Sequence, residues 1–177
     1  MKDTVNLTSS DALIGRVGGA TSVVNKAGST IAVQSAAYAS GDVLGTTSPI
    51  TADVFRMEGN ANVSASAILQ SIIIKDLSKQ SLAIDVVIFN ANPTVTTMTD
   101  NSALDIADAD IDKVIGVVSI VAADYAAFND NSVATKVGIG LPMAVTSGTK
   151  IWFCLVTRGA PTYVLNELSI SFGILQD

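Results

Sequence analysis

Short apolar runs rich in Val, Ile and Thr, separated by turn-forming Gly, Asn, Asp and Pro, recur along most of this 177-residue chain. Residues 168–174 alternate cleanly between apolar and small side chains, and in residues 64–74 and 82–89 the two-residue spacing places Ile72 with Ile74, and Ile84 with Val86 and Ile88, on one face. A period of two residues is the period of a β-strand. About eight such runs, with little helical pattern, predict an all-β fold: an antiparallel β-sandwich with a jelly roll as the leading topology.

The strand pattern also predicts partners and burial. Polar residues 75–80 suit a hairpin connection, so residues 64–74 and 82–89 are expected to pair as antiparallel strands. Residues 114–121 are β-branched and continuous, which predicts a buried strand. Residues 151–156 are apolar on both faces, as expected of a central strand that is covered on both sides.

Helix is expected only in short pieces. Residues 100–113 begin with acidic side chains and end near Lys113, which suits the helix dipole, so one or two turns are predicted there. Residues 123–128 could form a second short turn. Residues 1–28, interrupted by glycines, are interpreted as an N-terminal arm or edge segment, and residues 29–177 as the β-sandwich domain.

Composition lowers the expectation of catalysis. The chain contains no histidine, the side chain that most often serves as a general base or metal ligand near neutral pH. Charged residues make up only 15%, and the net charge is −6, so neither nucleic acid nor an anionic membrane surface is an expected partner. The single cysteine, Cys154, excludes an internal disulfide and a cysteine-based zinc site.

The acidic segment contains the best candidate for a metal site. Asp108, Asp110 and Asp112 have the spacing of the first ligands of an EF-hand loop, but Lys113 stands where glycine is required and Ser119 where glutamate is required. A solvated acidic turn that caps a short helix is the favoured interpretation. The sequence therefore assigns no metal ligand.

Other candidate sites are equally weak. Gly138-Ile139-Gly140 lacks the third glycine of a dinucleotide fingerprint and is interpreted as a bend in a strand. Cys154 lies in the most apolar strand and is expected to be an inert core residue. Trp152 is the first candidate for sugar binding if a sheet face has that role. The sequence assigns no catalytic or cofactor-binding residue and no cofactor.

A glycosidase requires two carboxyl groups about 5 to 10 Å apart. Asp85, Asp124 and Glu167 are available for such a pair, but the sequence does not place any two of them together. An enzyme of this kind is the third hypothesis.

Several motifs resemble a family of small virion proteins of tailed bacteriophages and prophages. They lie in residues 92–103, in DIADAD at residues 105–110, in VIGVV at residues 114–118, in VTRGAPTY at residues 156–163 and in the ending FGILQD at residues 172–177. The resemblance covers roughly residues 41–177. It implies a decoration or cement protein that binds the major capsid protein, and it transfers no catalytic residues.

These observations predict a non-enzymatic protein of the capsid surface. Synthesis in the host bacterial cytoplasm is expected, because residues 1–3 lead into polar residues and not into the apolar stretch of a signal peptide. A homo-oligomer is expected, with a trimer favoured. Deletion of residues 1–28 is expected to weaken capsid attachment and to leave the core folded. The alternative is a tail- or fibre-associated jelly roll that binds cell-surface carbohydrate.

Overall fold

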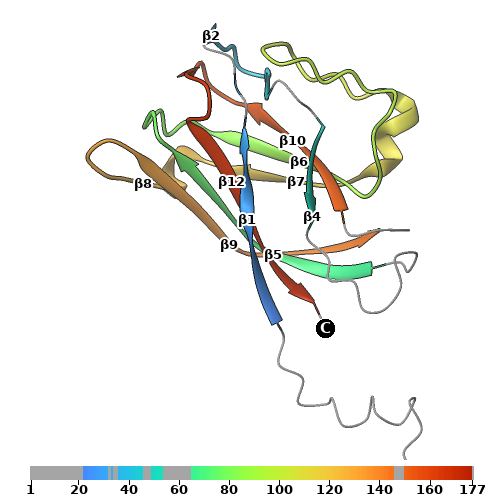
Figure 1. Ribbon diagram of the computed structural model, residues 1–177. Coiled ribbons are helices and arrows are strands. Elements are labelled where there is room, and N and C mark those ends of the chain that lie inside the picture. The colour runs from blue at the N-terminus through green and yellow to red at the C-terminus, as the bar shows by residue number, and fades with distance from the viewer. Residues whose placement is uncertain are drawn as a thin grey trace, which may run out of the picture.

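A computed structural model describes residues 22–31, 33, 36–45, 49–53, 65–145 and 150–176. These residues form two antiparallel sheets packed face to face, as Figure 1 shows. The antiparallel β-sandwich predicted from the sequence is confirmed. The first sheet has the order β1 (Ser22–Ile31), β12 (Leu168–Gln176), β5 (Ala65–Asp76), β9 (Ser132–Val145) and β8 (Tyr125–Ala127).

The second sheet has the order β3 (Val43–Leu44), β10 (Lys150–Thr157), β6 (Ile84–Phe89) and β7 (Val114–Ile120), and β4 (Ile50–Asp53) also pairs with β10. A short ribbon joins β2 (Ala36–Ala37) to β11 (Thr162–Tyr163). The first and last strands, β1 and β12, are neighbours, and the chain passes repeatedly from one sheet to the other, for example between β4 and β5, between β5 and β6 and between β9 and β10. The jelly-roll topology stays a prediction, which this strand order favours.

The main core lies between the two sheets. Because side chains alternate along each strand, Ile72 and Ile74 of β5 face inward together with Ile170 and Phe172 of β12. Phe153 of β10 meets Phe172 across the sandwich, with ring centroids 5.0 Å apart in an edge-to-face arrangement. This aromatic pair joins the two layers.

The predicted pairing of residues 64–74 with residues 82–89 is wrong. β5 pairs with β12 and β9, whereas β6 pairs with β10 and β7. The connection at residues 77–83 crosses from one sheet to the other, and Lys79 and Ser81 adopt positive φ angles of 55° and 51° within it. Alternation shows which side chains share a face but contains no information about the partner strand.

The strand β7 is less buried than predicted. Val118 and Ile120 are buried, but Val117 is 53% exposed. β7 forms the edge of its sheet, and its second face is only partly covered. Both helical predictions correspond to 3-10 turns, η2 (Asp108–Lys113) and η3 (Ala122–Asp124), although residues 125–127 of the second predicted turn form β8 instead.

The strand β10 is buried on both faces, as predicted. Ile151, Phe153 and Leu155 face the main core, while Cys154 and Val156 face a second apolar cluster on the outer side of the sheet. This outer cluster consists of Val43, Val87, Phe89, Met98, Cys154 and Val156, with Leu104, Ile106, Val114 and Trp152 packed against it. Several of these residues belong to residues 90–113, which therefore form a third layer over the second sheet (Figure 1).

The predicted domain boundary at residue 28 falls inside β1. This strand pairs with β12 from Ser22 to Ile31, with a register shift between Lys26 and Ser29. Residues 1–21 of the predicted arm lie outside the described residues. A deletion to residue 28 would remove part of the sheet, so a deletion that tests the arm alone should end at residue 21.

Replacing Phe153 with alanine should lower the free energy of unfolding by about 3 to 5 kcal/mol, because it leaves a cavity between the sheets beside Phe172. Denaturant unfolding monitored by circular dichroism measures the change. Val137→Ala is the control, since Val137 is 70% exposed, and it should change stability by less than about 0.5 kcal/mol. Equal effects of the two substitutions would contradict this assignment of the core.

Candidate functional site

The three aspartates of the acidic segment do not converge on one point. Asp110 is fully buried, whereas Asp108 and Asp112 are exposed. Asp110 Oδ2 accepts hydrogen bonds from the backbone amides of Val95 (2.9 Å) and Thr96 (2.6 Å), and Oδ1 accepts one from Lys113 Nζ (2.7 Å). Lys113 is the main reason why the pKa of Asp110 lies well below its usual range. Asp110 therefore anchors residues 90–113 from inside, and the interpretation as a solvated turn is wrong for it.

No three His, Cys, Asp or Glu side chains are grouped to hold a metal ion in the part of the chain that the structure describes. The glycine motif forms a bulge: Gly138 and Gly140 have φ angles of 70° and 66°, and the register between β5 and β9 shifts there. The bend in the strand predicted for these residues is confirmed. A side chain would be strained at either glycine.

Cys154 and Trp152 both lie on the outward face of β10. Cys154 is completely buried, and burial raises the pKa of its thiol to about 12, so it stays protonated near neutral pH. Trp152 is half-buried and packs against the outer cluster. Both side chains thus contribute to the packing of residues 90–113 against the second sheet.

The three carboxylates considered for glycoside hydrolysis each have a different partner. Asp85 pairs with Arg158 (2.7 Å), and Asp124 pairs with Lys136 (3.1 Å) and accepts a hydrogen bond from the amide of Val121. Glu167 accepts hydrogen bonds from the Val164 amide (2.7 Å) and from the Ser78 hydroxyl. None of these hydrogen bonds and ion pairs joins two of the three carboxylates.

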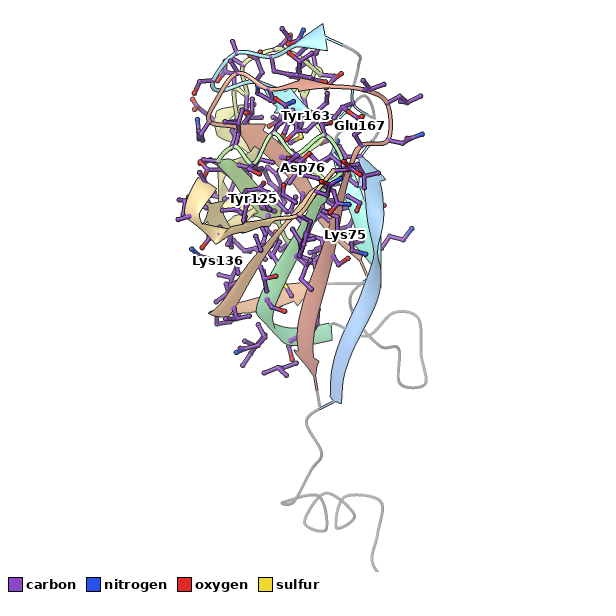
Figure 2. The ribbon with its side chains drawn as sticks, turned by 90° about the vertical axis from the view of Figure 1, so that its left-hand side faces the viewer. Lys75, Asp76, Tyr125, Lys136, Tyr163 and Glu167 are labelled. Atoms are coloured by element: carbon purple, nitrogen blue, oxygen red, sulfur yellow. The ribbon has the colours of Figure 1, made fainter. Side chains whose placement is uncertain are left out.

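A buried polar cluster at one end of the sandwich was missed in the sequence. Asp76 ends β5 and is fully buried, and its Oδ2 accepts a hydrogen bond from the Ser81 amide (2.8 Å). Its Oδ1 and the hydroxyls of Tyr125 and Tyr163 are buried and lack hydrogen-bond partners. Figure 2 shows these three side chains in the same part of the molecule, contributed by β5, β8 and β11. Burial raises the pKa of each of the three groups.

The sequence contained a signal for this cluster. Ile72, Ile74 and Asp76 continue one alternation, so the strand places Asp76 on the same inward face as the two isoleucines. The sequence analysis ended the strand at residue 74 and interpreted residues 75–80 as a polar connection. It therefore did not place Asp76 on the inward face.

The outward face of the first sheet is nearly free of charge. Among its described side chains in β5, β8, β9 and β12, Lys75 alone is charged. Val137 is 70% exposed and Ile68 is 43% exposed on this face. We call this surface the flat face; its residues are Ser66, Ile68, Ser71, Ile73, Lys75, Ala126, Val133, Thr135, Val137, Pro142, Ala144, Ser169, Ser171 and Leu175.

A shallow groove lies on the opposite side of the sandwich, in residues 90–113. Its volume is about 310 Å³, at the lower end of the range for small-molecule sites. Its lining includes three hydroxyl-bearing residues and one carboxylate residue, and consists of Val95, Thr97, Thr99, Ser102, Ala103, Asp105 and Ala107. Trp152 is not part of that lining.

No protein-family model matches this chain, and a comparison with curated proteins finds no match. Within the described residues, no helix has the length and apolar character needed to cross a membrane.

Replacing Asp110 with asparagine should lower the melting temperature near neutral pH, because it removes the charge that pairs with Lys113. The pKa of Asp110 is lowered in the folded state, so its stabilising effect is complete above the ordinary value of 3.8 and is lost as the pH falls through the folded-state pKa. Melting curves between about pH 2 and pH 7 should therefore show the variant and the wild type converging in acid. Asp112→Asn, which changes an exposed neighbour, is the control, and an equal effect of both substitutions at all pH values would refute the assignment.

Proposed function

We propose that this protein is a non-enzymatic bacteriophage head decoration protein, which binds the major capsid protein on the outside of the capsid through the flat face. Two observations support the proposal. The motifs in residues 92–103, 105–110, 114–118, 156–163 and 172–177 resemble small virion proteins, and the flat face is an apolar and hydroxyl-bearing surface that continues across four strands. The second of these observations carries the proposal.

The physical properties of the flat face suit binding to a protein. Val, Ile and Thr side chains in a hydrogen-bonded sheet have few rotamers to lose, so ordering them on binding costs little conformational entropy. Exposed apolar area such as that of Val137 and Ile68 becomes favourable when it is removed from water. A surface with one charge also avoids the desolvation penalty of buried ions.

The same proposal includes a homo-oligomer, with a trimer favoured, located in the virion. Closed symmetry suits a protein that binds around a symmetry axis of an icosahedral shell. Three copies of one surface on three equivalent sites would raise the overall avidity well above the affinity of a single contact.

Replacing Val137 with glutamate should reduce occupancy on purified capsids at least about tenfold, because a charge on the flat face would lose its water on binding. Val137 is exposed, so the fold should be retained, and circular dichroism checks this point. Val95→Glu is the matched control, because Val95 is 59% exposed and lies on the opposite side of the sandwich. Normal occupancy of the Val137 variant, or equal losses in both variants, would exclude the flat face as the capsid-binding surface.

The alternative function, carbohydrate binding by a tail- or fibre-associated module, is favoured by the groove in residues 90–113. Threonine and serine hydroxyls together with the carboxylate of Asp105 can exchange hydrogen bonds with the hydroxyls of a neutral sugar. No cationic side chain is among the residues that line the groove, so anionic ligands suit it poorly.

If the groove binds sugar, a glycan array should give a signal that Asp105→Asn lowers at least about tenfold, because the substitution removes a charge-assisted hydrogen bond. Trp152→Ala tests the residue that the sequence analysis gave as the first candidate for sugar binding. Because Trp152 does not line the groove, this substitution should leave sugar binding unchanged in a protein whose fold is retained. Absence of any glycan signal for the folded wild-type protein would exclude this alternative.

A further inference from the structure

The buried cluster of Asp76, Tyr125 and Tyr163 joins segments that are distant in the sequence. Asp76 lies one alternation beyond Ile74 on the inward face of β5, and Tyr125 pairs with Ala134, the residue opposite Ile74. Tyr163 reaches the cluster from β11. The charge of Asp76 raises the pKa of both tyrosines, and Tyr125 contributes to the raised pKa of Tyr163, so the three groups are close enough to interact electrostatically (Figure 2).

The hydrogen bonds around Asp76 are unequally distributed. Oδ2 accepts from the Ser81 amide, and the backbone amides of residues 78–80 also favour the charged form. Oδ1 and the two tyrosine hydroxyls remain without partners, and each buried polar atom in this condition costs stability. A neutral carboxylic acid carries one O–H donor, which one of these hydroxyls can accept, whereas beside an ionised carboxylate the hydroxyls themselves must act as the donors.

We propose that Asp76 is a proton-sensitive latch: as a neutral carboxylic acid it donates its single proton to the hydroxyl of either Tyr125 or Tyr163, and it thereby fastens the connection at residues 77–83 to β8 or to β11. Ionisation of the carboxyl removes this donor and leaves a charge in a buried position. The inference goes beyond capsid binding and does not depend on it.

The charged groups around the cluster do not neutralise Asp76. The ion pairs of the described residues involve Asp110, Asp124 and Asp85, and none involves Asp76. Lys136 pairs with Asp124, Lys75 lies on the flat face, and Lys79 Nζ donates to the carbonyl of Asn129 (3.2 Å). The remaining groups that face the cluster are Asp124 near Tyr125, and Glu167 and Tyr38 near Tyr163; they are anionic or uncharged, so they add no cation that would favour ionisation.

These surroundings determine how the contribution of Asp76 to the free energy of unfolding changes with pH. Burial raises the pKa of Asp76 above its ordinary value of 3.8, and the amides of residues 78–81 only partly oppose this effect. The folded protein then binds the proton more tightly than the unfolded chain does. The contribution of Asp76 to stability is complete below the unfolded-state pKa and declines as the pH rises through the folded-state pKa.

The first test compares melting temperatures of the wild type and Asp76→Asn from about pH 3 to pH 8. Asparagine keeps an oxygen for the Ser81 amide and offers N–H donors to the tyrosines without a charge. The melting temperature of the variant relative to the wild type should rise with pH, by roughly 2 to 5 °C for each unit by which the folded-state pKa is raised. Asp112→Asn should show no such trend. A difference between Asp76→Asn and the wild type that is constant with pH would overturn the latch.

The second test measures the titration midpoint of Asp76 directly, from the carboxyl carbon resonance that Asp76→Asn removes. The midpoint should lie above 3.8, the ordinary value for an aspartate. If the acid donates to a tyrosine, removal of that hydroxyl in Tyr125→Phe or Tyr163→Phe should lower the midpoint, because the neutral form loses a hydrogen bond. A midpoint that rises in both variants would show instead that the hydroxyls donate to an ionised carboxylate, and the proposal would then be wrong.

Discussion

Burial of β10 on both faces is the constraint on which the rest of the structure depends. A strand whose successive residues are all apolar is stable in water only if a layer covers each side of it. The first sheet covers the inner side, and residues 90–113 cover the outer side with Met98, Leu104 and Ile106. The long excursion between β6 and β7 thus covers the outer face of β10, while its own outer side is exposed to solvent.

Buried carboxylates hold this outer layer in place. Asp100 accepts hydrogen bonds from the Tyr38 hydroxyl (2.9 Å) and the Gly45 amide (2.7 Å), and Asp110 accepts them from the amides of Val95 and Thr96. Irregular backbone leaves amide groups that neither sheet can pair, and a carboxylate can accept several of them at once. Asp76 lies at the end of β5 and has no ion-pair partner among the described residues. The same residue type therefore has a lowered pKa at Asp110 and a raised pKa at Asp76, because Lys113 is present at one and burial dominates at the other.

The two outer surfaces of the sandwich differ in kind. The flat face is regular, almost uncharged and formed by hydrogen-bonded strands, so it can meet another protein with little rearrangement. The opposite side consists of residues 90–113, where hydroxyl groups line a small groove. The proposed capsid contact involves the flat face and the alternative sugar site involves the groove, which is why substitutions at Val137 and Asp105 separate the two proposals.

The sequence alone determined the all-β class, the double burial of residues 151–156, the short helical turns and the bend at Gly138-Ile139-Gly140. These features depend on alternation, composition and glycine conformation, which are local properties. Tertiary structure decided that β5 pairs with β12 and β9, that residues 90–113 form a layer, that Asp110 is buried and that Asp76 meets two tyrosines. Each of these features depends on contacts between residues far apart in the chain. Alternation along a strand determines which face a side chain lies on, but it does not determine which residue from elsewhere in the chain packs against it.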